Sequence, residues 1–462
     1  MAPHDRTATA KDPRVKDSNF LKENNARHLW HPMAHPADSM ANPPAIITQG
    51  DGVHVTDVDG HRVVDAVGGL WNVNLGYSCE PVKQAIADQL EGLPYYSIFR
   101  GTSNDKVIEL SYVLQDFFAP DGLTRAFFTS GGSDSVEVAL KLARQYHRAR
   151  GEAGRSKYIS LLKGYHGTHF GGASVNGNEK FRHAYDPLLP GCVHVPGPYL
   201  YRNVFDATTA EDLAGKCLNM LEKTIAFEGA HTIAAFIMEP VQGAGGVIPP
   251  HPSFMPALRE ICDRHGILLI ADEVITAFGR TGTETGSRHW GVQPDFACTA
   301  KAITNGYFPF GAVMIHARVA EVFETGGKIA SVDTGYTYSG HPVGAAAALA
   351  CLAETDRIKP WTNAGPRGAE LKAGLEDLAD RFDVIGDVRG EGLMCAIEFT
   401  SDRATKAAPD MAAVARFQKA AYEDGTMVRV SGPNAIFSPP LIVTSDDVQT
   451  ILRSTEAGLR AM

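Results

Sequence analysis

Apolar residues gather along this chain in short continuous runs, separated by longer stretches in which they recur at helical spacing. Short apolar runs bounded by glycine or polar residues indicate strands, and the run at 267–271 has the character of a buried parallel strand. Such runs cover residues 126–129, 157–162, 232–238, 267–271 and 311–316. Helical spacing indicates helices over residues 80–90, 105–118, 134–150, 343–354, 365–381 and 412–424. This alternation predicts an α/β fold.

The two ends of the chain follow other patterns. Residues 53–65 alternate apolar and polar positions on both sides of Asp59-Gly60, which predicts a β-hairpin. From about residue 360 onward, helical stretches mix with strand patterns at 393–399 and 426–430. This mixture predicts a small α+β domain at the C-terminal end.

An aspartate and a lysine each follow an apolar run. Asp272 ends the run at 267–271, and in open α/β sheets ligands bind at the carboxyl edge of the strands. Lys301 follows apolar residues 296–300, so we expect a partly desolvated, nucleophilic amine of lowered pKa. A pyridine-ring cofactor requires a carboxylate beneath its cationic ring. Asp272 and Lys301 are therefore a candidate pair for pyridoxal 5′-phosphate, although each residue alone could be a buried acid or a surface lysine.

A glycine-rich turn separates the strand at 126–129 from the helix at 134–150. Glycines such as Gly132 let the backbone approach an anion closely, and the free N–H groups and dipole of the helix attract a phosphate. The Ser133 hydroxyl adds a further donor. A glycine-serine pair before a helix is also an ordinary cap, so this signal is weak by itself.

Several separated motifs together resemble the class III aminotransferases, most closely the omega-amino-acid:pyruvate branch. They are DEVITAFGRTG at 272–282 and AKAITNGY at 300–307, within a resemblance that runs from about Trp30 to near the C-terminus. The resemblance implies fold type I, with a mostly parallel seven-stranded sheet in a large domain. It also implies a homodimer, possibly a tetramer, with the site at the interface. We divide the chain into an N-terminal segment that joins the small domain and the dimer contacts (1–70), a large cofactor domain (71–340) and a small domain (341–462).

The resemblance also assigns roles around the cofactor. Tyr165, in the motif Tyr165-His166-Gly167, would stack on the pyridine ring, as suits a flat, electron-poor ring. Thr337 would reach across the dimer to the phosphate of the other subunit. The predicted cofactor contacts are Gly132, Ser133, Tyr165, His166, Glu239, Asp272, Val274, Lys301 and Thr337.

Predicted substrate contacts come from the same resemblance. Trp71 and Tyr165 would face the substrate, and Phe99 would enter the pocket of the partner subunit. Arg429 would clamp a carboxylate and swing away for other substrates, because arginine pairs with carboxylates in bidentate geometry. Arg100 stands where many relatives carry an aromatic residue and would favour an anionic tail. Core packing for Trp71 and surface positions for the two arginines are the competing interpretations.

The predicted reaction is transfer of an amino group to pyruvate, which leaves as alanine. Lys301 would bind the cofactor and then move the substrate proton, while Asp272 keeps the ring nitrogen protonated. Relatives that use 4-aminobutyrate carry a glutamate where this chain has Ala244, which favours β-alanine, taurine or an arylalkylamine as donor. A decarboxylase or aminomutase of the same fold, and a non-catalytic binding protein, remain as alternatives.

Charge and cysteine content limit the classes of binding partner and the cellular compartment that we expect for this protein. A formal net charge of −10 disfavours nucleic acid and anionic membranes. Seven scattered cysteines without a C-x-x-C pair, and the absence of a secretory or membrane-spanning run, predict a cytoplasmic protein. We predict no metal site, because Pro32 lies between His31 and His35 and breaks the helix that such a pair would use.

Overall fold

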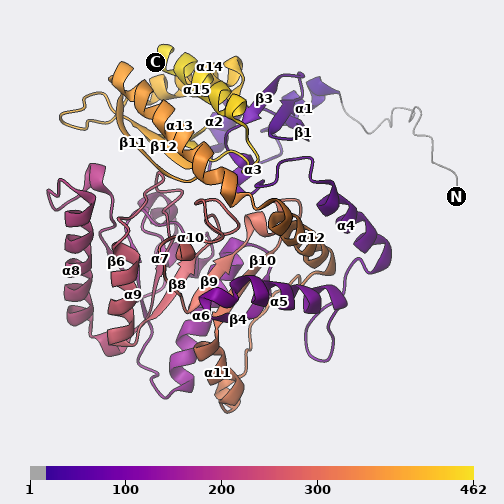
Figure 1. Cartoon of the computed structure of the whole chain (residues 1–462), viewed down its shortest axis with the longest axis vertical. Coiled ribbons are helices and arrows are strands. Elements are labelled where there is room, and N and C mark those ends of the chain that lie inside the picture. The colour runs from indigo at the N-terminus through magenta and orange to yellow at the C-terminus, as the bar shows by residue number, and fades with distance from the viewer. Residues whose placement is uncertain (1–16) are drawn as a thin grey trace.

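A seven-stranded sheet forms the centre of the computed structural model, which describes residues 17–462 (Figure 1). The spatial order of its strands is β4–β10–β9–β8–β7–β5–β6. The bounds are β4 Leu123–Thr129, β5 Lys157–Leu161, β6 Cys192–Val195, β7 Ile233–Met238, β8 Leu268–Asp272, β9 Phe296–Thr299 and β10 Gly311–His316. Within this sheet β10 runs opposite to the other strands, which confirms the predicted α/β fold with a mostly parallel sheet.

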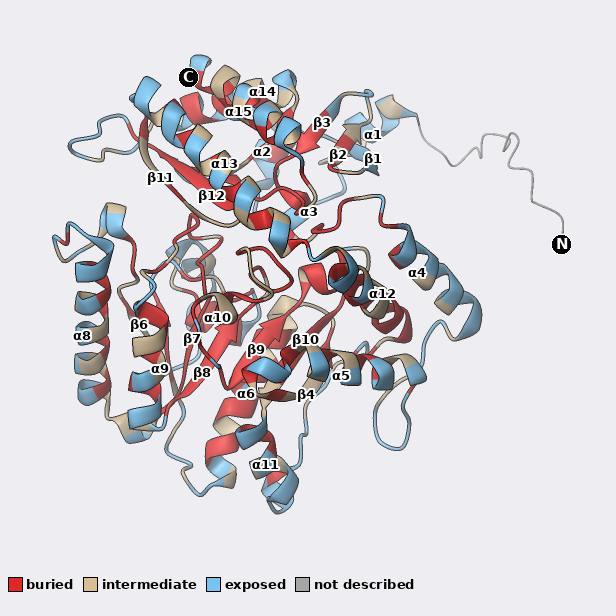
Figure 2. Cartoon of the chain, viewed as in Figure 1, coloured by how far each residue is buried: buried red, intermediate tan, exposed pale blue. Residues whose placement is uncertain are grey.

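Helices cover both faces of this sheet, so its central strands are apolar on both sides. Every residue of β7 and β8 is buried, as Figure 2 shows for the centre of the molecule. One face packs against α6 and the other against α8 and α9. The helices of this part are α4 Glu80–Gly92, α5 Asp105–Phe118, α6 Gly132–Ala149, α7 Phe170–Val175, α8 Ala210–Glu228, α9 Phe254–His265, α10 Gly286–His289, α11 Ala317–Thr325 and α12 Pro342–Ile358.

The C-terminal part forms a second, antiparallel sheet in the order β11–β12–β15–β14. Three helices pack against it around a separate apolar cluster. The bounds are α13 Trp361–Arg381, β11 Ile385–Glu391, β12 Met394–Phe399, α14 Met411–Asp424, β14 Arg429–Ser431, β15 Asn434–Phe437 and α15 Ser445–Arg460. This arrangement agrees with the predicted α+β character of the region.

The N-terminal strands form a third sheet together with a strand from near the C-terminus, at one end of the molecule (Figure 1). The bounds are α1 Ser18–Asn24, α2 Pro36–Ala41, β1 Ile47–Asp51, β2 His54–Asp57, β3 Arg62–Asp65, α3 Gly68–Trp71 and β13 Thr426–Met427. Pairing of β2 with β3 confirms the predicted hairpin, and β13 pairs with β3 in parallel. The division at residues 70 and 340 stays a prediction.

Two features differ from the sequence prediction. The strand predicted at 426–430 is split, because β13 and β14 belong to different sheets on either side of Val428. Strand β6 was not predicted, since this edge strand contains His194 and three of its four residues are only half-buried. Across residues 17–462, none of the helices combines the length and the apolar character needed to cross a bilayer.

Candidate active site

A cavity of about 340 Å³ lies at the carboxyl ends of the central strands of the large sheet. This is the edge at which ligands bind in open α/β sheets. The structure brings most of the predicted site residues together in this one place. The predicted residues that line the cavity are Trp71, Gly132, Ser133, Tyr165, His166, Glu239, Asp272, Val274, Lys301 and Arg429.

Asp272 is the last residue of β8, and its carboxylate lies buried at the floor of the cavity. Its Oδ2 is 2.8 Å from Nδ1 of His166, and its Oδ1 accepts a hydrogen bond from the backbone of Val274. The other ring nitrogen of His166, Nε2, is buried and has no hydrogen-bond partner among the described residues. The histidine therefore holds Asp272 as an acceptor that can face a protonated ring nitrogen.

Lys301 begins a 3₁₀ turn, Lys301–Thr304, directly after β9. Its φ angle of 52° lies in the left-handed region, which is uncommon for a residue with a side chain and costs about 1–3 kcal/mol. Burial lowers the pKa of its amine to about 8, although Asp272 and Glu239 act in the opposite direction. At pH 7 about a tenth of this amine is therefore unprotonated and nucleophilic, far more than for an ordinary lysine.

The N-terminus of α6 faces the same cavity through Gly132 and Ser133. No side chain caps this helix end, so its first N–H groups remain available to an anion. A side chain on Gly132 would meet Val274 at 2.9 Å, which explains the need for glycine there. The Ser133 hydroxyl accepts a hydrogen bond from the backbone of Thr168.

Glu239 follows β7 and positions two neighbours of the cavity rather than pointing freely into it. Its Oε1 accepts from the backbone N–H of Tyr165 at 2.9 Å, and its Oε2 accepts from Gly243 at 2.8 Å. Burial raises the pKa of Glu239 to about 7, and the nearby Asp272 adds to this effect. The glutamate thereby orients the segment that carries the Tyr165 ring.

Arg429 begins β14 and brings a half-buried guanidinium to the cavity. This side chain forms no hydrogen bond or ion pair with any residue in the described part of the chain. Burial lowers the pKa of Arg429, because desolvation disfavours the charged form. A desolvated cation without a partner is a strong attractor for the carboxylate of a ligand.

Trp71 is both a wall of the cavity and a member of the main apolar cluster, with 1% of its surface exposed. Its φ angle of 65° is again in the left-handed region. The two interpretations of this residue, substrate contact and core packing, are therefore compatible in the structure.

Phe99, Arg100 and Thr337 do not line the cavity around Lys301. Phe99 and Arg100 border a separate hollow near β4, where the side chain of Arg100 is 95% exposed and lies 3.6 Å from Asp333. Thr337 is exposed, and its carbonyl accepts from the hydroxyl of Tyr95 at 2.7 Å. Their predicted contacts with the partner subunit's pocket stay predictions.

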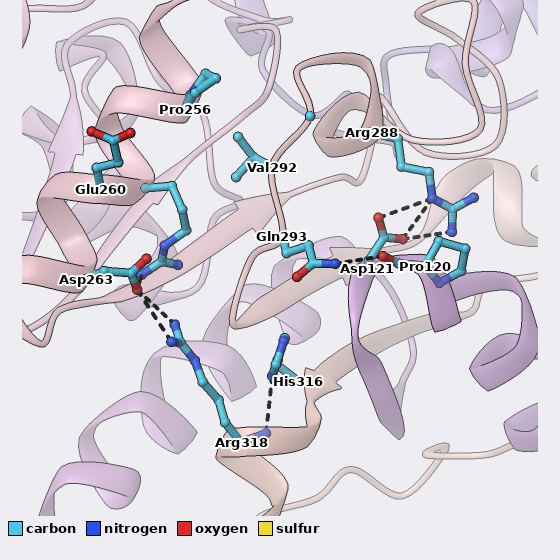
Figure 3. Close-up of a pocket in the computed structure, with 12 residues that line it drawn as sticks. Pro120, Asp121, Pro256, Glu260, Asp263, Arg288, Val292, Gln293, His316 and Arg318 are labelled. Atoms are coloured by element: carbon cyan, nitrogen blue, oxygen red, sulfur yellow. Dashed lines mark hydrogen bonds and ion pairs between the residues drawn. The ribbon is translucent and has the colours of Figure 1, made fainter.

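A larger hollow of about 610 Å³ lies at the opposite edge of the sheet, near the starts of β8 and β9 (Figure 3). Several of its charged groups pair with one another, as Arg288 does with Asp121 and Arg318 does with Asp263. This hollow lacks the lysine and the uncapped helix end of the smaller cavity. We therefore assign the chemistry to the cavity around Lys301.

The sequence interpretation missed some parts of the site. Met33, Leu70, Phe181 and Ile275 also line the cavity, but they lie in loops or short turns whose residue types carry no periodic signal. The sequence interpretation also assigned no role to Glu273, the neighbour of Asp272. Glu273 points away, and its buried carboxylate accepts four hydrogen bonds, from Thr276 Oγ1, Gly286 N, Ser287 N and Ser287 Oγ.

The residues of the cavity fit pyridoxal phosphate. They supply a nucleophilic amine, a buried carboxylate held by histidine, an aromatic ring at Tyr165, and an uncapped helix end for the phosphate. The unpartnered Nε2 of His166 is a further polar atom that this enclosed site leaves available.

Comparison with known proteins agrees with this chemistry. The family model of class-III aminotransferases matches residues 36–459. A diaminobutyrate–2-oxoglutarate transaminase of Halomonas elongata is 36% identical and covers 95% of both chains. A putrescine–pyruvate aminotransferase of Pseudomonas aeruginosa is also 36% identical and covers 88% of both. The crystal structure of an amine transaminase from an uncultivated Pseudomonas species, with pyridoxal phosphate bound, is similar at 47% identity and a TM-score of 0.93. That comparison covers 94% of this chain and 99% of the other.

Proposed function

Because the chain belongs to the class III aminotransferases and uses pyridoxal phosphate, we propose that it transfers the amino group of a primary amine or omega-amino acid to pyruvate. The donors we propose are β-alanine, taurine or an arylalkylamine, which would leave as an aldehyde or ketone. The observation that carries the proposal is the unpaired guanidinium of Arg429 in the same cavity as Lys301. Such a cation can receive the carboxylate of a keto acid in one half-reaction.

The residues around Arg429 support pyruvate over a larger keto acid. Ala244 lines the cavity and brings no carboxylate that would hold the arginine away from the substrate. The walls are largely apolar, with Trp71, Tyr165 and Phe181 among them. A small acceptor needs one cation, whereas the second carboxylate of 2-oxoglutarate would require another. Among the described residues that line the cavity of this single chain, Arg429 brings the one guanidinium and Lys301 the one amine, and Lys301 has a different task.

We assign the steps of the reaction to four side chains. When bound, pyridoxal phosphate supplies an aldehyde carbon and a ring that accepts electrons. The neutral amine of Lys301 would take the proton from the carbon that bears the donor's amino group and deliver it to the carbon of the cofactor's former aldehyde group. Asp272, oriented by His166, would keep a proton on the ring nitrogen of the bound cofactor. Tyr165, which lines the cavity, would cover the ring and help the apolar walls to exclude water.

We also propose that the active enzyme is a homodimer, possibly a tetramer, in which Phe99 and Thr337 contact the pocket of the other subunit. Phe99 is half exposed and borders a hollow at the molecular surface, as expected for a side chain that needs a partner. Light scattering of the holoenzyme should give a multiple of the mass of the chain. A monomer with full activity would contradict this part of the proposal.

The amino transfer itself can be tested by supplying the holoenzyme with each donor class and either pyruvate or 2-oxoglutarate. We expect alanine to form with pyruvate, together with loss of the visible absorbance of the cofactor on adding the amine and its return on adding pyruvate. Glutamate as the dominant product would overturn the choice of acceptor. Release of carbon dioxide, or turnover without any keto acid, would instead support a decarboxylase or an aminomutase.

A further inference from the structure

Arg389 is a buried arginine of β11 that contacts several parts of the molecule at once, with 8% of its surface exposed. Its Nε donates to the carbonyl of Gly246 at 2.7 Å, and its Nη2 donates to Oδ1 of Asn434 at 2.5 Å. Its Nη1 lies 2.7 Å from Asp387 and 3.0 Å from Glu398. Each of the three guanidinium nitrogens of Arg389 thus has a partner, in contrast to those of Arg429.

The first contact of Arg389 holds one wall of the active-site cavity. Gly246 ends the turn at 243–246, in which Ala244 lines the cavity. At its other end the turn is anchored by the hydrogen bond from Gly243 to Glu239. Gly246 has a φ of 119°, and a side chain there would lie 2.8 Å from Arg389 Nη2. This turn is therefore held between Glu239 on one side and Arg389 on the other.

The second contact of Arg389 holds the strand that carries the pocket arginine. Asn434 donates from Nδ2 to the carbonyl of Ser431 at 3.2 Å, and these two residues pair at the tight end of the β14–β15 hairpin. Arg429 lies two residues before Ser431 on β14 and pairs with Ile436. Fixing Asn434 therefore fixes the hairpin from which Arg429 enters the cavity.

Buried charges keep Arg389 in this position. Glu398 is 1% exposed and accepts from the hydroxyl of Tyr199 and from Nε of Arg202, the latter at 2.5 Å. The guanidinium of Arg389 also lies 4.9 Å from the centre of the Tyr199 ring. Moving Arg389 would take one of two cationic partners from the buried Glu398 and leave it with Arg202 alone, which is unfavourable for a buried carboxylate.

We propose that Arg389 is a positioning residue, which sets the spacing between the turn at 243–246 and the strand that carries Arg429. One planar guanidinium donates both to Gly246 in the turn and to Asn434 in the hairpin. The turn and the hairpin therefore cannot move apart or together independently. Affinity for the carboxylate of the keto acid then depends on Arg389, although Arg389 itself does not contact the substrate. This inference rests on the proposed function, because it assigns the carboxylate to Arg429.

The test compares Arg389→Lys with wild type in two assays of the holoenzyme. Lysine keeps the charge beside Glu398 but cannot donate to Gly246 and Asn434 with a planar fork. We expect the KM for pyruvate to rise at least about tenfold, while the single-turnover rate with an amine that lacks a carboxylate changes less than about twofold. Calorimetric titration with oxamate, an unreactive analogue of pyruvate, should show the same loss of affinity.

Two controls separate positioning from general destabilisation. Arg155→Lys alters a comparably buried arginine at the opposite edge of the sheet, where it donates to the carbonyls of Ala230, Ile233 and His265. We expect it to leave both assays unchanged. In an Arg429→Ala background, Arg389→Lys should have little further effect on oxamate affinity, because coupled residues are not additive.

If Arg389→Lys does not fold, Asn434→Ala breaks the same connection to the hairpin while leaving the buried charges in place. Equal losses in both half-reactions, unchanged affinity for oxamate, or additive effects in the Arg429→Ala background would each overturn the positioning role. Failure of the wild-type enzyme to use pyruvate would instead refute the proposed function. The oxamate titration is read independently of turnover, so the two failures are distinguishable.

Discussion

The lowered pKa of Lys301 makes a quantitative prediction about how the protein without cofactor captures pyridoxal phosphate. The amine attacks the aldehyde only when it is neutral, so the capture rate follows the unprotonated fraction. With a pKa of about 8, half of the Lys301 amines are neutral at pH 8. An ordinary lysine, with a pKa of about 10.4, would be about 0.4% neutral at that pH. Burial is thus expected to raise the reactive fraction about a hundredfold.

Stopped-flow absorbance of the apoprotein mixed with pyridoxal phosphate measures this rate between pH 6 and pH 10. We expect about a tenfold rise per pH unit below pH 8 and a plateau above it. The reaction of the cofactor with a free lysine derivative is recorded in parallel, and the ratio of rates removes the titration of the cofactor itself. A ratio without a change of slope near pH 8 would refute the assignment of a desolvated amine to Lys301.

Other substitutions separate the roles of neighbouring groups. Asp272→Asn should lower kcat about a hundredfold or more with little loss of folding stability, because the carboxylate that faces the ring nitrogen becomes neutral; an unchanged kcat would contradict this role. Glu273→Ala should lower the free energy of unfolding by about 3 kcal/mol or more, since it removes a buried acceptor of four hydrogen bonds. Denaturant titration checks this, and a stable variant would show that the acceptor is dispensable. Arg429→Ala should raise the KM for pyruvate at least about thirtyfold and spare amines without a carboxylate; steady-state kinetics that change equally for both would argue against it.

The arrangement of the large domain follows from local sequence where strands are buried on both faces. The apolar run at 267–271 predicts β8 and places Asp272 at its carboxyl end, because a strand with two buried faces needs apolar residues throughout. The edge strand β6 lacks this signal. In β6 half-buried positions replace a continuous apolar run, and His194 interrupts the pattern. Pairing between distant segments, as of β13 with β3, also leaves no local trace.

The active site was predictable only in part, because some of its contacts also join segments that are distant in sequence. Lys301 and Asp272 belong to motifs whose spacing carries the chemistry, and the structure brings both to one cavity. Glu273 is also a carboxylate and is adjacent to Asp272 in sequence, yet three of the four hydrogen bonds that fix its position come from α10, more than ten residues later. Two contacts of Arg389 come from still more distant segments, at Gly246 and Asn434. Contacts of this kind depend on the folded chain rather than on any local pattern.

The attachment of the cofactor to Lys301 can be measured directly. Borohydride reduction of the holoenzyme fixes pyridoxal phosphate to the amine that holds it, and mass spectrometry of the digested protein identifies that residue. We predict that the label lies on the peptide containing residue 301 and that Lys301→Ala abolishes it together with amino transfer. Label on another lysine of an active wild-type enzyme, or normal turnover by Lys301→Ala, would contradict the mechanism.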